Sequence, residues 1–290
     1  MSDFILTCES TADLNAEWYE KRGIRYAFFH LYLGDQEYDD NIGVSVTHQQ
    51  MYDVMMGGVD VHSSQVGTAE YIDLFEPILK EGKDILHVTL AHGISGTINS
   101  ANAARDELSD KYPDRRIEIV DSYNASSGFG MIMDYLADLK DGGASLDECK
   151  DWLLNNRLKF RLTVLSTDLT FLIKGGRVSK GAGAIAKVLN ICPIIDMISD
   201  GTLKVVDKIR GKKKAMEYMV ERMKAEAKDG VNYSGKCFLS QWDEEKANIM
   251  KDMIEETFPN LRGQVKIFPI GGTIGVHTGP GTVVVFYEGA

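Results

Sequence analysis

Three short polar segments of the sequence could hold an anion. They are Ser63-Ser64-Gln65, the loop Gly93-Ile94-Ser95-Gly96-Thr97, and His277-Thr278 within a glycine-rich run near the end of the chain. Ser95 lies between a predicted strand and a predicted helix, so its hydroxyl and the next amides should face one anion at the helix N-terminus. The alternative is an ordinary capping serine, which stabilises a helix by about 1 kcal/mol. Glycines on both sides of Ser95 favour the anion site, because they let backbone approach a ligand closely.

Ser95 and His277 also allow an enzyme acting on a small acyl or phosphorylated substrate, with both residues catalytic. A histidine can donate a proton or change its charge near neutral pH. However, the nucleophile pattern of many hydrolases is GxSxG, and Thr97 stands at the second glycine here. No acid that would orient His277 can be assigned from the sequence. The enzyme is therefore the alternative to a binding site made of the same residues.

A basic stretch extends from Lys174 to Lys214, with ten basic and three acidic residues, in a chain whose net charge is −11. The overall charge argues against nucleic acid as a partner, since a phosphate backbone requires a basic surface. The stretch is either a solvated surface or a docking face for an acidic partner or for phosphate. Within it, Arg177 follows Gly175-Gly176, which either end a short helix or point Arg177 at a carboxylate or phosphate.

The composition indicates a soluble, cytoplasmic protein with no metal and no disulfide. The six histidines form no i,i+4 pair and no cluster with acids, so no metal site is expected. The four cysteines are far apart and are expected to be reduced thiols. We find neither a run of eighteen apolar residues nor a signal peptide.

Residues 1–160 are expected to form a lobe in which strands and helices alternate. This alternation is typical of a mostly parallel sheet covered by helices on both faces. The predicted strands are 4–7, 25–33, 85–90 and 117–120. The predicted helices are 15–22, 47–56, 68–80, 97–108, 129–139 and a last one that begins with the capping box Ser145-Leu-Asp-Glu148 and ends near residue 156.

Residues 161–290 are expected to form a second α/β lobe with a mixed or antiparallel sheet, and the ligand should lie between the lobes. Asp200-Gly201 between apolar runs predicts a hairpin of strands 193–198 and 203–209. Further strands are expected at 162–165, 237–240, 265–270 and 282–287, and helices at 168–174, 212–227 and 244–258. The run from Gly271 to Gly281 is either a tight turn or a loop that approaches a ligand.

Taken in order, these segments resemble the DegV family of bacterial fatty-acid-binding proteins, over nearly the whole chain. The matching segments are Glu9-Ser-Thr-Ala-Asp-Leu14, Ser63-Ser-Gln65, Gly93-Ile-Ser-Gly-Thr-Ile-Asn-Ser-Ala101, Asp121-Ser122, Leu172-Ile-Lys-Gly-Gly-Arg-Val178, Leu189-Asn-Ile-Cys-Pro193, Lys208-Ile-Arg210 and His277-Thr-Gly-Pro-Gly281. No single motif is decisive, but their number and order make coincidence a poor explanation.

The resemblance implies a carrier subunit of fatty acid kinase that has no catalytic residue and no cofactor of its own. A long-chain fatty acid would lie in a buried tunnel, with its carboxylate held by Ser63 and Ser95. Gly96, Thr97, His277 and Thr278 would complete the head-group site. A separate ATP-binding kinase subunit would dock near Arg177 and Arg210 and form the acyl phosphate for phospholipid synthesis, with transient contact to a membrane surface.

Overall fold

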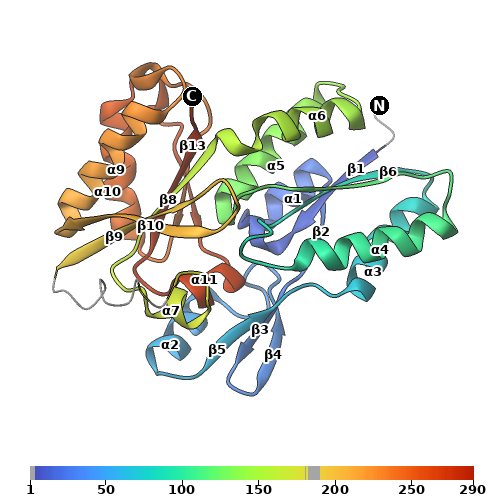
Figure 1. Cartoon of the computed structure of the whole chain (residues 1–290), viewed down its shortest axis with the longest axis horizontal. Helices are drawn as coiled ribbons and strands as arrows, with labels where there is room; N and C mark the ends of the chain where they lie inside the picture. The colour runs from blue at the N-terminus through green and yellow to red at the C-terminus, as the bar shows by residue number, and fades with distance from the viewer. Residues whose placement is uncertain (1–3, 180, 182–189) are drawn as a thin grey trace.

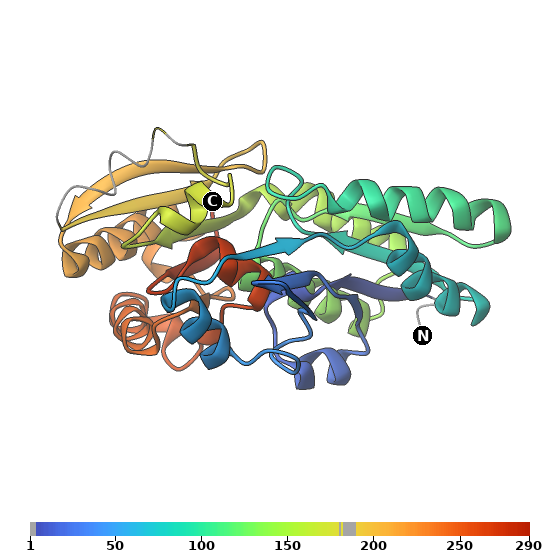
Figure 2. The same cartoon turned by 90° about the horizontal axis from the view of Figure 1, so that it is seen from below.

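The computed structural model describes residues 4–179, 181 and 190–290 of the chain. They form an α/β fold with three sheets, which we call A, B and C (Figures 1 and 2). The strands of sheets A and B lie before residue 122, whereas those of sheet C begin at Phe160. The expected α/β architecture, with a parallel first sheet and a mixed last one, is confirmed. That residues 1–160 and 161–290 are separate domains stays a prediction.

Sheet A is parallel throughout, in the order β2-β1-β6-β7. Its strands are β1 (Phe4–Glu9), β2 (Arg25–Ala27), β6 (Asp84–Thr89) and β7 (Ile117–Asp121). Parallel strands require crossover connections, which place helices on the faces of the sheet. One face carries α1 (Ala16–Arg22), α5 (Ser126–Asp141) and α6 (Leu146–Asn156), and the other carries α3 (Thr68–Lys80) and α4 (Thr97–Lys111) (Figure 1).

Local sequence explains where these helices begin and which side they bury. Asn15 caps α1 by accepting a hydrogen bond from the backbone of Trp18, and the capping box of Ser145 and Glu148 is present at α6. In α3, Tyr71 and Phe75 lie on the buried side together with the other apolar residues of that face. A 3.6-residue period places them on one stripe, which packs on sheet A.

Sheet B is a small antiparallel sheet that the sequence did not predict. It consists of β3 (His30–Leu33), β4 (Gln36–Asp39) and β5 (Val61–Ser64), in the order β4-β3-β5. The single strand predicted over residues 25–33 is wrong, because the chain leaves sheet A after Ala27 and enters sheet B at His30. Ser63 and Ser64 therefore end a strand. Helix α2 (His48–Met56) lies between β4 and β5 in the chain.

Sheet C is mixed, in the order β10-β9-β8-β13-β11-β12, and only β11 and β12 are parallel. Its strands are β8 (Phe160–Leu165), β9 (Ile191–Met197), β10 (Leu203–Arg210), β11 (Phe238–Gln241), β12 (Lys266–Pro269) and β13 (Val283–Glu288). The helices of this part are α7 (Thr170–Lys174), α9 (Lys212–Glu226), α10 (Glu244–Thr257) and α11 (Gly272–Thr278). The predicted Asp-Gly hairpin is confirmed as β9 and β10.

The two faces of sheet C serve different cores. Along β13, Val285 and Tyr287 pack in the cluster that α9 and α10 cover, whereas Val284 and Phe286 belong to the larger core on the opposite face. This follows from the two-residue period of a strand. Short 3₁₀ turns at Ser10–Ala12, Arg157–Lys159, Gly230–Asn232 and Pro259–Leu261 complete the described elements.

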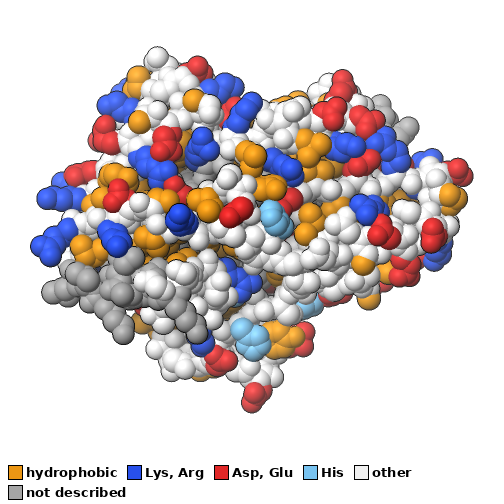
Figure 3. Space-filling view, viewed as in Figure 1, with side chains coloured by type: hydrophobic (Ala, Val, Ile, Leu, Met, Phe, Trp, Pro, Cys, Tyr) orange, Lys and Arg blue, Asp and Glu red, His pale blue; other side chains and the backbone are white. Residues whose placement is uncertain are grey.

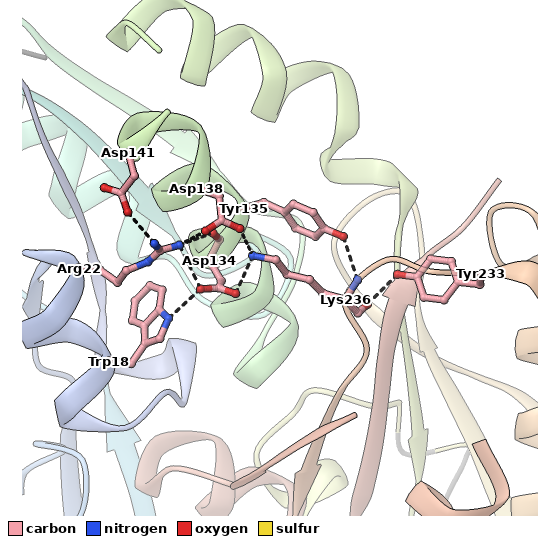
Figure 4. A network of polar contacts seen from close by, with 8 residues as sticks. All are labelled: Trp18, Arg22, Asp134, Tyr135, Asp138, Asp141, Tyr233 and Lys236. Atoms are coloured by element: carbon pink, nitrogen blue, oxygen red, sulfur yellow. Dashed lines mark hydrogen bonds and ion pairs between the residues drawn. The ribbon is translucent and has the colours of Figure 1, made fainter. Parts of the chain in front are cut away.

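A charge network on α5 joins the two parts of the chain (Figure 4). Nζ of Lys236, just before β11, lies 2.6 Å from Asp134 Oδ2 and 2.5 Å from Asp138 Oδ2. Arg22 of α1 binds Asp134 and Asp138 from the other side, and Trp18 Nε1 donates to Asp134 Oδ1 at 2.8 Å. Burial opposes the charge of Asp138, but hydrogen bonds from Lys236 and Arg22 hold its pKa below the ordinary value.

All four cysteines are buried and free. In the part of the chain that the structure describes, no helix combines the length and the apolar character needed to cross a bilayer.

Candidate functional site

A cavity of about 330 Å³ lies where sheets A, B and C meet. Leu90 follows β6, and Ala125 and Ser126 begin α5 after β7, so the cavity is at the carboxyl ends of the parallel strands. This is the usual ligand position in open α/β folds. Ser63 and Ser64 reach it from β5, and the last turn of α11 supplies His277 and Thr278. The cavity thus lies between sheets of the two chain halves, and that it is the predicted ligand site stays a prediction.

Most of the cavity wall is apolar. Leu162 and Val164 of β8 lie opposite Phe286 and Val284 of β13 in the antiparallel register, and all four line the cavity. The remaining apolar lining comes from Phe29, Leu90, Ile94, Ala125, Leu172, Leu203 and Ile274. A wall of this kind is suited to hydrocarbon, because each buried methylene contributes about 0.8 kcal/mol.

Four of the polar residues that line the cavity are Ser63, Ser95, Arg177 and His277, which we call the polar cluster. Ser63 Oγ lies 2.8 Å from His277 Nε2. Arg177 NH1 lies 3.5 Å from His277 Nδ1, donates to the carbonyl of Gly175 at 2.6 Å, and Arg177 Nε donates to Ile94 O at 3.1 Å. The structure therefore brings Ser63 and His277 into contact, with Arg177 beside them, and places Ser95 in the wall of the same cavity.

His277 is neutral in this environment. Burial, the charge of Arg177 and the nearby His62 lower its pKa to about 3. An arginine can only donate hydrogen bonds, so a neutral His277 that accepts from Arg177 at Nδ1 carries its proton at Nε2. Nε2 then donates to Ser63 Oγ. The hydroxyl proton of Ser63 is consequently left to be donated into the cavity.

The position of His277 depends on Gly175. A Cβ atom at Gly175 would overlap Nδ1 of the imidazole. Gly175 ends α7 as its C-cap, so the ring of His277 lies directly against the backbone at the end of that helix. The Gly-Gly pair before Arg177 therefore does more than end a helix, because it leaves the space that the histidine fills.

Ser95 presents a second hydroxyl to the cavity. Its Oγ accepts a hydrogen bond from the backbone of Thr97 at 3.3 Å, and its own proton has no acceptor among the described residues. Gly93, two residues before Ser95, was expected to let backbone approach a ligand, and the structure gives it a different role. A Cβ at Gly93 would overlap the carbonyl of Gly201, so Gly93 admits the tip of the β9–β10 hairpin and not a ligand.

The other residues predicted at the head group divide between the cavity and the core. Gly96 and Thr278 line the cavity, although the hydroxyl of Thr278 donates to Ile274 O at 3.0 Å. Thr97 is fully buried, and its hydroxyl lies 2.6 Å from the hydroxyl of Tyr71 and donates to Glu9 Oε1 at 3.2 Å. Its side chain thus belongs to a buried network around Glu9, and is not among the cavity-lining groups.

The two arginines predicted to dock a partner lie in different places. Arg177 is half-buried in the cavity wall, whereas Arg210 is exposed at the end of β10. Lys204 and Lys208 are exposed on the same strand, and α9 begins with Lys212, Lys213 and Lys214. Lys and Arg side chains are seen on this side of the molecule, among acidic ones (Figure 3). Lys180, Lys187 and Leu189 lie outside the described residues.

The geometry does not favour the catalytic alternative. His277 bonds Ser63 rather than Ser95, and its other nitrogen faces a cation where a Ser-His-acid triad has a carboxylate. A histidine with a pKa of about 3 is a weak base at neutral pH. Among the described residues, no group of three or more His, Cys, Asp or Glu side chains is arranged to hold a metal ion.

Sequence reasoning offered Arg177 as one of two alternatives, either beside a helix end or pointing at a carboxylate or phosphate, and it missed the buried carboxylate of Glu9. Glu9 accepts hydrogen bonds from Tyr71, Thr11 and the backbone of Leu90, and so holds together the ends of β1 and β6. The sequence does contain a signal for the wall residues of β8 and β13, because alternate residues of an apolar strand point to opposite faces of the sheet. That signal tells that two faces exist but not which one meets a ligand.

The family model described as an uncharacterised protein of the DegV family matches residues 4–290. A DegV domain-containing protein of Clostridium perfringens is 33% identical, over 100% of this chain and 98% of its own length. A DegV family protein from Eubacterium eligens, solved loaded with heptadecanoic acid, is 24% identical with a TM-score of 0.85, covering 98% of this chain and 99% of its own. The Fatty Acid Kinase (Fak) B3 protein of Streptococcus pneumoniae, loaded with linoleic acid, is 24% identical with a TM-score of 0.84, covering 99% of both chains. The chain therefore belongs to the DegV family.

Proposed function

We propose that this protein binds a long-chain fatty acid in its cavity, with the carboxylate at the polar cluster. The observation that carries the proposal is that the hydroxyls of Ser63 and Ser95 line one cavity with Arg177, and that the Ser95 proton has no acceptor among the described residues. With His277 Nε2 donating to Ser63, the Ser63 proton is open as well. Two open donors beside a cation suit a group that only accepts hydrogen bonds, as a carboxylate does.

The energies of the two ends of the ligand are different in kind. A long alkyl chain offers roughly 10 kcal/mol at about 0.8 kcal/mol per methylene, before the cost of ordering it. The carboxylate must recover its lost hydration, which otherwise costs several kcal/mol. The hydroxyls and Arg177 provide that compensation. The fatty acids named for the solved relatives from Eubacterium eligens and Streptococcus pneumoniae support the same ligand class.

We propose further that the protein is a carrier, and that a separate ATP-dependent kinase subunit phosphorylates the bound carboxylate. A carboxylate oxygen attacks the γ-phosphorus of the nucleotide, an O–P bond forms, and the bond to the bridging oxygen breaks as the nucleoside diphosphate leaves. A carboxylate has no proton to lose, so the carrier needs no general base. The neutral, hydrogen-bonded His277 is consistent with this, and its role is to hold Ser63.

The exposed face of β10 and the start of α9 is our candidate for docking the kinase subunit. Lys212, Lys213 and Lys214 occupy the first turn of α9, where the helix dipole disfavours cations. Such an arrangement costs helix stability and produces a strongly positive site, which attracts an acidic partner. Arg210 and Lys208 extend this site along β10.

The test of binding is native mass spectrometry of the purified full-length chain, followed by solvent extraction and identification of bound lipid. We expect one fatty acid per chain. A chain that is purified empty and also fails to take up added palmitate would contradict the proposal. The carrier role is tested by adding a fatty acid kinase subunit and ATP and trapping acyl phosphate with hydroxylamine. Hydroxamate should form only when both proteins are present.

A further inference from the structure

Two surface depressions adjoin the polar cluster from outside the cavity. One, which we call the outer recess, has a volume of about 230 Å³ and shares His277 with the cavity. The other, which we call the α4 groove, has about 620 Å³ and shares Ser95 and Gly96 with it. If the carboxylate at the polar cluster becomes an acyl phosphate, the new phosphoryl group has to extend toward one of them.

The α4 groove is less suited to a phosphoryl group because two carboxylates line it and already contact two of its three basic side chains. His92 Nδ1 lies 2.6 Å from Asp121 Oδ2, and Lys150 Nζ lies 3.1 Å from Glu118 Oε2. Arg157 donates to the carbonyl of Asp121 at 2.9 Å. Two carboxylates in the same groove would repel a dianion.

The outer recess has a cation that can change partners. It is lined by Asp60, Val61, His62, Phe171, Lys174, Gly175, Val276 and His277. Lys174 forms an ion pair with Asp60 across its edge, and the two side chains are 55% and 69% exposed. An ion pair this exposed contributes little to stability and is easily replaced by a stronger one. A lysine ammonium is a compact charge that binds phosphate well.

We propose that the outer recess receives the phosphoryl group of the acyl phosphate and that Lys174 leaves Asp60 to bind it. This inference rests on the proposed function. The carboxylate carries one negative charge and the acyl phosphate carries two, so a second cation is needed when the group is transferred. Arg177 faces the cavity from one side of His277, and Lys174 lines the recess on the other. Lys174 therefore distinguishes the product from the fatty acid.

The test compares two ligands with the same chain, palmitate and hexadecyl phosphate, a stable mimic of the product. Both are titrated into the full-length protein, with fatty acid removed beforehand. Lys174→Gln should weaken the affinity for hexadecyl phosphate about tenfold, as expected for the loss of one charged contact. It should change the affinity for palmitate by less than about twofold. Asp60→Asn frees Lys174 from its ion pair, so it should raise the affinity for hexadecyl phosphate about threefold. Lys174→Arg should keep most of the affinity for the phosphate.

His92→Gln is the matched control for the rival groove and should change neither affinity. The inference is overturned if Lys174→Gln weakens the binding of both ligands equally or of neither. It is overturned as well if His92→Gln weakens the binding of hexadecyl phosphate alone. It is also overturned if the wild type binds palmitate but not hexadecyl phosphate. A wild type that binds neither ligand contradicts the proposed function itself, so the two failures are distinguishable.

Discussion

The charge network on α5 and the polar cluster both join the first part of the chain to the second, yet they are built differently. In the network, Lys236 and Arg22 each lie within ion-pair distance of both Asp134 and Asp138. In the polar cluster, one cation and two hydroxyls meet without any carboxylate. The charges of the network are all paired with one another, whereas the polar cluster keeps hydrogen-bond donors available for a ligand. We infer that the network stabilises the fold and that the cluster serves a ligand.

The largest effect should come from breaking the network. Asp134→Ala removes a buried carboxylate that Lys236, Arg22 and Trp18 share, so it should cost about 3 kcal/mol of unfolding free energy. Urea unfolding measures this, and Asp141→Ala, at a 58% exposed side chain, should cost less than about 0.5 kcal/mol. Palmitate affinity should stay the same in both. Equal costs for the two variants would show that the network does not stabilise the fold.

The second prediction concerns pH and the neutral histidine of the cluster. The folded pKa of His277 is about 3 and its ordinary value is 6.5, so the unfolded state binds a proton that the native state excludes. His277 therefore contributes stability that is present above pH 6.5 and is lost as pH falls toward 3. Between pH 7.5 and 5 the loss is about 2 kcal/mol.

Comparing urea unfolding of the wild type and His277→Gln at these two pH values isolates this contribution. The pKa of His48 is also lowered by burial, but that effect is common to both proteins and cancels. The variant should be less sensitive to pH than the wild type. If both proteins lose the same stability on acidification, His277 is not held neutral by its surroundings.

The third prediction separates a hydroxyl whose proton has no acceptor among the described residues from one that is hydrogen-bonded within the protein. Ser95→Ala should weaken palmitate binding about tenfold, roughly 1.4 kcal/mol, and change the stability of the empty protein by less than about 0.5 kcal/mol. Thr97→Val, two residues away, removes a hydroxyl that Glu9 and Tyr71 use. It should cost about 1 kcal/mol of stability and leave affinity within twofold. The reverse pattern in calorimetry and unfolding would refute the assignment.

The smallest effect on the protein itself is expected at the exposed docking face. Arg210→Ala should alter stability and palmitate affinity very little, because surface charges contribute little. It should slow acyl phosphate formation with a kinase subunit several-fold at low salt, and the difference should shrink at high salt. Lys228→Ala, at an exposed lysine outside this face, is the control. Normal rates for Arg210→Ala at every salt concentration would place docking elsewhere.

Much of the fold could be predicted from the sequence, because its signals are local. The Asp-Gly hairpin and the capping boxes at α2 and α6 are set by residues a few positions apart. The helix α11 was not predicted, since a run of glycines disfavours a helix and only packing stabilises it here. A Cβ at Gly275 would overlap Trp242, so glycine is required by the tertiary fit. Local propensity could not have revealed this.

The members of the candidate site could be named, but their geometry could not. Ser63 and His277 are 214 positions apart, and no local pattern tells that they form a hydrogen bond. The surroundings of Arg177 could not be predicted either. The Gly175-Gly176 pair before it is equally compatible with a helix end and with close packing against a buried imidazole. Which hydroxyl is open and which is used, as for Ser95 and Thr97, depends on contacts with β1 and α3.

The alternation along β13 has a consequence for how this protein can change over generations. Val284 and Phe286 line the cavity, and Val285 and Tyr287 pack under α9 and α10. A substitution at one set alters the space available to a ligand, and a substitution at the other alters the second core. Ligand preference and the packing of α9 and α10 are thus encoded at different positions of the same six-residue strand. Selection can therefore act on the shape of the cavity there without disturbing the packing beneath α9 and α10.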